Sequence, residues 1–124
     1  MKTKPPLISV VDDDESIRES LPHLLREFGY AAPAFSSAEE FLGSEYLDQT
    51  DCLILDVAMP SMTGPELQSE LMIRKRRIPI IFISAEKDET LRPRLLKLGA
   101  VECLFKPFSE ADLLVALDAV FRTS

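Results

Sequence analysis

Cys52-Leu53-Ile54-Leu55-Asp56 is the stretch of sequence that decides the fold, because four consecutive apolar residues end there in a carboxylate. A short apolar run with a β-branched member predicts a strand that is buried on both faces, as in a parallel sheet. Asp56 is then placed at the carboxyl end of that strand. Ligands of open parallel α/β sheets bind outside the carboxyl ends of the strands, so Asp56 is a candidate functional residue.

The composition describes one globular domain. Of the 124 residues, 46% are hydrophobic and 28% are charged, which is close to the globular average. We therefore expect a single domain over residues 1–124. The apolar stretches are much shorter than the roughly 20 residues of a membrane-spanning helix, and residues 1–11 hold too short an apolar run for a signal peptide. The sequence predicts a cytoplasmic protein with no membrane partner.

The formal net charge of −7 argues against direct nucleic-acid binding by this domain, because affinity for a phosphate backbone rests on Lys and Arg. An acidic chain suits the capture of a cation instead. The two cysteines, Cys52 and Cys103, lack the spacing of a metal site, and no Cys/His cluster accompanies them. We expect both thiols to be reduced and to pack as small apolar side chains.

Strand and helix patterns alternate five times along the chain, which predicts a parallel sheet with right-handed crossovers and helices on both faces. Strands are expected at 7–11, 30–34, 52–56, 78–83 and 101–105, and helices at about 17–28, 37–42, 65–74, 86–98 and 109–121.

The fourth predicted helix contains a misfit, Pro93. Proline removes a backbone donor from a helix interior, so two structures remain open. Either the helix begins near Arg92 with Pro93 in its first turn, or it is kinked. In both structures the amino-terminal half of segment 86–98 is expected to be loose.

Polar residues follow four of the five predicted strands: Asp12 and Asp13, Asp56, Ser84, and Lys106. Taken singly, each is also typical of a helix cap, a turn or a surface lysine, but the carboxyl ends of parallel strands share one edge, where we expect these side chains to converge. Clustered carboxylates raise one another's pKa values, and a hard divalent ion such as Mg²⁺ removes that penalty. A carboxylate beside Mg²⁺ can attack phosphorus, so formation of an aspartyl phosphate is a candidate function.

Short motifs occur in a fixed order along the chain. They are Val10-Val11-Asp12-Asp13, Leu55-Asp56-Val57 with Met59-Pro60 and Gly64, Ser84-Ala85, Gly99-Ala100 and Lys106-Pro107-Phe108. This ordered set resembles the receiver domain of two-component response regulators over essentially all 124 residues. The segment from Val11 to Leu21 looks most like receivers attached to helix-turn-helix transcription factors of the nitrogen-fixation regulator type.

The resemblance implies a flavodoxin-like (βα)5 three-layer sandwich with a five-stranded parallel sheet of order 2-1-3-4-5. It also implies a cis peptide bond between Lys106 and Pro107. With that strand order, one strand separates Cys52 from Cys103, so the two lie about 9–10 Å apart. That separation is too long for an intramolecular disulfide.

The resemblance implies a role for each site residue. Asp56 would accept a phosphoryl group from a histidine kinase. Asp13, Asp56 and the backbone carbonyl of Ala58 would hold Mg²⁺, with Asp12 helping through water. The residues that would bind the phosphoryl oxygens are Ser84 and Lys106.

The implied function is a phosphorylation-dependent switch that assists its own phosphorylation and dephosphorylation but is not an enzyme for an external substrate. Its partners would be the kinase and its own output domain or an effector protein. A phosphorylation-dependent homodimer would form through the fourth helix, fifth strand and fifth helix. Two alternatives stay open: a degenerate receiver that acts as a binding module, and a small aspartate-nucleophile phosphohydrolase. Such hydrolases usually carry a second Asp two residues after the nucleophile, where this chain has Ala58.

The chain departs from the family pattern in the region that reports phosphorylation. Receivers usually carry Tyr or Phe three positions before the lysine, where this chain has Cys103. Phe105 lies on the same side of the strand by two-residue alternation, and we hypothesise that it presents an apolar contact to a partner. Because Pro93 loosens the fourth helix, we also hypothesise that phosphorylation reorders residues 85–93.

Overall fold

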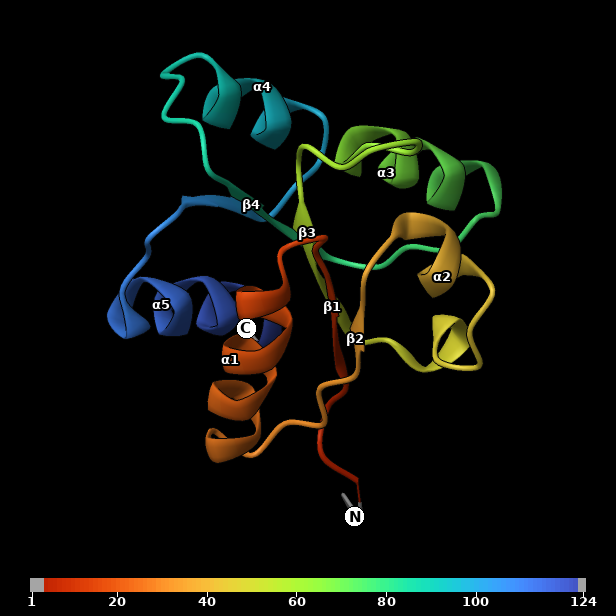
Figure 1. Ribbon diagram of the computed structural model, residues 1–124, viewed down its shortest axis with the longest axis vertical. Helices are drawn as coiled ribbons and strands as arrows, with labels where there is room; N and C mark the ends of the chain where they lie inside the picture. Colours follow the sequence, from red (N-terminus) through yellow and green to blue (C-terminus); the bar gives the residue numbers. More distant parts are fainter. Residues whose placement is uncertain (1–3, 123–124) are drawn as a thin grey trace.

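The computed structural model describes residues 4–122. Five parallel strands form one sheet of order β2-β1-β3-β4-β5, and helices cover both of its faces (Figure 1). This confirms the predicted flavodoxin-like fold class. The elements are β1 (Ile8–Val11), α1 (Glu15–Glu27), β2 (Ala34–Phe35), α2 (Ala38–Leu42), the 3-10 helix η1 (Leu47–Gln49), β3 (Cys52–Asp56), α3 (Gly64–Ile73), β4 (Ile80–Ser84), α4 (Leu91–Lys97), β5 (Glu102–Phe105) and α5 (Glu110–Phe121).

The central strands β1, β3 and β4 are buried along their whole length. Successive side chains point to opposite faces of the sheet, so Leu55 packs under α2, α3 and α4, whereas its neighbour Ile54 packs under α1 and α5. Each fully buried aliphatic side chain contributes roughly 1.5–3 kcal/mol relative to exposure. The predicted strand 52–56 is therefore correct in both bounds and burial.

Side-chain caps fix the start of the helices that follow β1, β3 and β5. Asp14 accepts a hydrogen bond from the Ser16 backbone at 3.0 Å, and Ser109 caps α5 in the same way. At α3 the cap is reciprocal: Thr63 N donates to Glu66 Oε1 at 2.9 Å, and Glu66 N donates back to Thr63 Oγ1 at 3.3 Å. Such caps hold the loops at the carboxyl edge of the sheet in place.

The fourth helix is shorter than predicted. It begins at Leu91, with Pro93 in its first turn, which confirms the first of the two structures that the sequence left open. Residues 85–90 lie outside the helix and are exposed. Asp88 forms a turn there by accepting hydrogen bonds from the backbone and hydroxyl of Thr90 at 2.9 and 2.7 Å.

Two strands begin two or more residues later than predicted, each after a proline that cannot donate to the ladder. β2 spans Ala34–Phe35 rather than 30–34, and β4 begins at Ile80, after Pro79.

The cysteines are free and buried. They lie on β3 and β5 and pack on opposite faces of the sheet. No helix within residues 4–122 is long and apolar enough to cross a membrane.

Candidate functional site

Three carboxylates gather at the carboxyl edge of the sheet. Asp12 and Asp13 follow β1, and Asp56 is the last residue of β3, which pairs with β1. One oxygen from each residue lies within 4.8 Å of the other two. Asp12 and Asp56 are buried, whereas Asp13 is exposed. The structure thus brings together the carboxylates that the predicted strand ends placed at one edge.

Ser84 ends β4, and Lys106 directly follows β5. Ser84 is the buried last residue of β4, and its hydroxyl hydrogen-bonds the backbone of Glu86, accepting from the N–H at 3.1 Å and donating to the carbonyl at 3.2 Å. The Lys106 N–H donates to the Ser84 carbonyl at 2.8 Å. Lys106 Nζ lies 3.0 Å from Asp12 Oδ2, and the Lys106–Pro107 peptide bond is cis, as the resemblance implied.

Gly64 closes the loop after Asp56 against the strand. Its N–H donates to the Val57 carbonyl at 2.9 Å. A Cβ at this position would overlap the carbonyl oxygen of Asp56 and would lie 3.0 Å from the Phe82 ring. Glycine is therefore required for close backbone approach. Ala58 lies exposed in this loop, and its role as a metal ligand stays a prediction.

Burial raises the pKa of Asp56 to about 7, and the negative charge of Asp12 adds to the rise while Lys106 opposes it. Both effects disfavour the ionised carboxylate. At neutral pH, Asp56 alone therefore holds its proton part of the time. A further positive charge at the cluster would favour the ionised, nucleophilic form.

Burial lowers the pKa of Lys106, but the adjoining carboxylate of Asp12, together with Asp56 and Asp14, outweighs that effect and the net shift is upward. The side chain is 16% exposed. A lysine held between carboxylates keeps its proton. The site thus contains a fixed ammonium group beside the acidic cluster.

The acidic cluster fits a hard divalent cation. Asp12 Oδ2 is buried and makes no aligned hydrogen bond within residues 4–122, and the Lys106 ammonium lies 3.0 Å from it. Carboxylate oxygens are the ligands that Mg²⁺ prefers, and it is usually held by one or two of them together with water and phosphate. Asp12, Asp13 and Asp56 could hold such an ion.

One contact at the site was not predicted from the sequence. Arg18, in the first turn of α1, donates from Nη1 to the Asp12 carbonyl at 3.0 Å. This hydrogen bond ties the loop that carries the acidic pair to α1. No local sequence pattern predicts this contact, because an arginine on an exposed helix face is ordinarily solvated.

The family model for the response regulator receiver domain matches residues 8–118. Nodulation protein W of Bradyrhizobium diazoefficiens is 44% identical over 113 residues, which cover 91% of this chain and 50% of that protein. Transcriptional regulatory protein FixJ of Azorhizobium caulinodans is 37% identical over 112 residues, 90% of this chain and 53% of that protein. The structure of response regulator StyR has a TM-score of 0.83 and 45% identity, covering 92% of this chain and 58% of that one.

The chain belongs to the response regulator receiver domain family. It is a signalling domain of the two-component class, and its relatives include transcriptional regulators. The chain spans about half the length of the curated relatives it matches. As a class, receiver domains work between histidine kinases and output domains.

Proposed function

We propose that residues 1–124 form one receiver domain that accepts a phosphoryl group from a histidine kinase on Asp56 and thereby controls a transcriptional output domain. The observation that carries this proposal is the convergence of the buried Asp56 carboxylate with those of Asp12 and Asp13, within 4.8 Å. A fixed ammonium group on Lys106 lies beside them. Together these groups can bind a phosphoryl group and activate its acceptor.

In this mechanism an Asp56 oxygen attacks the phosphorus atom of a phosphohistidine. The new O–P bond forms as the N–P bond breaks, and the leaving histidine nitrogen keeps the electron pair. Lys106 pairs with a phosphoryl oxygen as a point charge. The Ser84 hydroxyl, now bonded to Glu86, turns to donate to another phosphoryl oxygen.

Mg²⁺ would be held by Asp13, Asp56 and the backbone carbonyl of Ala58, with Asp12 contributing through water. When bound, the ion supplies positive charge that favours ionised Asp56 and offsets the charge of the phosphoryl group. Support comes from the chemistry of the three carboxylates and from the buried Asp12 oxygen without an aligned hydrogen bond among the described residues.

We further propose that phosphorylation is reported on the face formed by α4, β5 and α5, through a partner or a second copy. Cys103 is 2% exposed and fills the place of the usual aromatic residue. Phe105 is half-buried against the same core cluster as Cys103, so it is positioned to report phosphorylation in place of the usual aromatic residue. Arg92 joins α4 to β5 through a two-point ion pair with Glu102, at 2.7 and 3.0 Å.

The decisive experiment is incubation of the protein with acetyl phosphate and Mg²⁺, followed by mass spectrometry. We expect the mass gain of one phosphoryl group, and no gain in the Asp56→Asn variant. No gain in the native protein would contradict the proposal and favour a binding module. Sustained phosphate release from a generic phosphoester such as p-nitrophenyl phosphate would instead favour a phosphohydrolase.

A further inference from the structure

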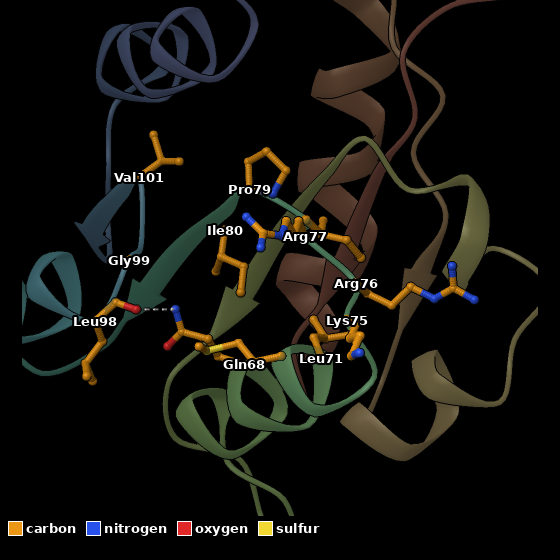
Figure 2. Close-up of a pocket in the computed structure, with 12 residues that line it drawn as sticks. Gln68, Leu71, Lys75, Arg76, Arg77, Pro79, Ile80, Leu98, Gly99 and Val101 are labelled. Atoms are coloured by element: carbon orange, nitrogen blue, oxygen red, sulfur yellow. Dashed lines mark hydrogen bonds between the residues drawn. The ribbon is translucent and has the colours of Figure 1, made fainter.

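A cavity of about 870 Å³ lies at the edge of the sheet opposite Asp56. It opens between the carboxyl-terminal ends of α3 and α4, above the starts of β4 and β5 (Figure 2). Gln68 of α3 crosses one side by donating to the Leu98 carbonyl at 3.3 Å. The volume lies within the range of ligand-binding sites, roughly 300–1,000 Å³. No step of the proposed phosphotransfer uses this cavity.

The floor of the cavity and one part of its rim are apolar. Leu71 and Ile80 form its buried part. Two rim residues are left unusually open for their type, since Met72 is 67% exposed and Leu98 is 57% exposed. Ile73, next to the cavity but not part of its lining, is 74% exposed. The apolar surface thus extends past the rim, which favours an occupant larger than the cavity itself.

One side of the cavity carries positive charge. Four consecutive cationic residues, Arg74 to Arg77, follow α3. Two of them are neutralised within the chain: Arg74 by Glu70 at 2.8 Å and Arg76 by Asp48 at 2.7 Å. Arg76 also extends away from the other lining residues in Figure 2.

Lys75 and Arg77 line the cavity and have no carboxylate within 4.0 Å in the part of the chain that the structure describes. Lys75 has φ of 60° just after the helix, a conformation that usually selects glycine or asparagine at a helix end. These two cations form a local positive patch on a chain with a formal charge of −7. They leave an uncompensated positive rim beside an apolar floor.

We propose that this cavity docks an acidic amphipathic segment of a partner protein. An apolar side chain of the segment enters between Met72 and Leu98, and its flanking carboxylates pair with Lys75 and Arg77. The unbranched thioether of Met72 can adapt to the inserted side chain, and complementary charge fixes the orientation of the segment. The cavity adjoins the hydrogen bond between Gln68 and Leu98, so a segment bound there would directly affect the end of α4.

The test is a selection of binding peptides from a displayed library of random sequences, with counter-selection on the double variant Lys75→Glu/Arg77→Glu. We expect the enriched peptides to combine an apolar residue with nearby Asp or Glu. A synthetic copy of an enriched peptide should bind the Arg77→Glu variant at least about tenfold more weakly than it binds the native protein. Lys87→Glu, the same charge reversal at an exposed site after β4, should leave affinity within about twofold.

A second matched pair tests the apolar contact: Met72→Ser should weaken binding, whereas Val115→Ser, equally exposed on α5, should not. All five substituted positions are exposed, so the variants should fold. Absence of enrichment, or peptides that bind Arg77→Glu unchanged, would overturn the proposal. Self-association of the native protein that is lost in Met72→Ser would also overturn the proposal, because the occupant would then be a second copy of this chain. If no peptide is enriched but octanoate shifts the amide resonances of Leu98 and Gly99, the proposal is overturned and the cavity is assigned to a small anion instead.

Discussion

Lys106 Nζ lies 3.0 Å from Asp12 Oδ2, and that oxygen makes no aligned hydrogen bond within residues 4–122. Among residues 4–122, Lys106 is the cation that pairs with a carboxylate of the acidic cluster, and it contacts Asp12 rather than Asp56. Buried like charges repel strongly, so Asp56 is left with a pKa raised to about 7 by burial and by Asp12.

Asp56→Asn should stabilise the metal-free protein, and more so at pH 8 than at pH 5. The pKa of Asp56 rises from 3.8 to about 7 on folding, so the folded protein binds more protons than the unfolded chain in that window. Native stability must then fall as the pH rises through it. We expect the variant to gain roughly 1–2 kcal/mol at pH 8.

Urea unfolding in EDTA at both pH values measures this difference. Glu89→Gln, which removes a charge from the exposed segment before α4, serves as the control and should show no such pH-dependent gain. Equal effects of Asp56→Asn at pH 5 and pH 8 would contradict the prediction.

Mg²⁺ should raise the melting temperature of the native protein, because the ion binds only the assembled cluster. At a concentration 100 times Kd the gain is about 2.7 kcal/mol. Asp13→Asn should lose most of it. Asp14→Asn is the matched control, since Asp14 caps α1 and asparagine caps helices as well. Differential scanning fluorimetry with and without Mg²⁺ checks this, and an equal loss in both variants would count against the assigned ligands.

Gly64→Ala should destabilise the protein by about 1–3 kcal/mol, because its Cβ would overlap the Asp56 carbonyl oxygen and must displace the strand end. Gly43→Ala is the control: its Cβ would meet Glu39 O at an ordinary 3.6 Å, so we expect a change below about 1 kcal/mol. Urea unfolding compares the two. Equal stabilities would show that the loop after Asp56 yields easily.

Residues 85–93 should exchange amide hydrogens more slowly after addition of beryllofluoride and Mg²⁺, which mimic the phosphoryl group. Residues 85–90 are exposed and non-helical, so a phosphorylation switch can act by making this segment more ordered. Mass-spectrometric hydrogen exchange measures the effect, with η1 (Leu47–Gln49) as an internal reference that should not change. Unaltered exchange at 85–93 would refute the proposed reordering.

Phe105→Ala should weaken phosphorylation-dependent association, since Phe105 is the half-buried aromatic of β5 on the face shared with Cys103. Analytical ultracentrifugation and kinase pull-down, each with beryllofluoride, test it. Leu47→Ala removes a partly buried apolar residue from η1, away from both proposed surfaces, and should have no effect. If both variants associate as the native protein does, another residue reports the switch.

The sequence by itself determined the fold class and the chemistry at the strand ends. The run from Cys52 to Asp56 predicted β3 with its observed bounds, because a short apolar run and its terminating carboxylate are local features. The predicted helix starts at 37 and 109 likewise fall on the residues that cap α2 and α5, Ser37 and Ser109. The ordered motifs then identified the family without any information on the distances between residues.

Only the tertiary structure decided what depends on distant residues. Asp12 and Asp56 meet because β1 and β3 pair, and the resulting loss of water raises the pKa of Asp56, which no local pattern encodes. The cavity beside Arg77 exists because α3 and α4 end near each other, held by a hydrogen bond across 30 residues of chain. Local sequence sets burial and caps, but packing sets distances, and distances set both the charge balance of a site and the shape of a binding surface.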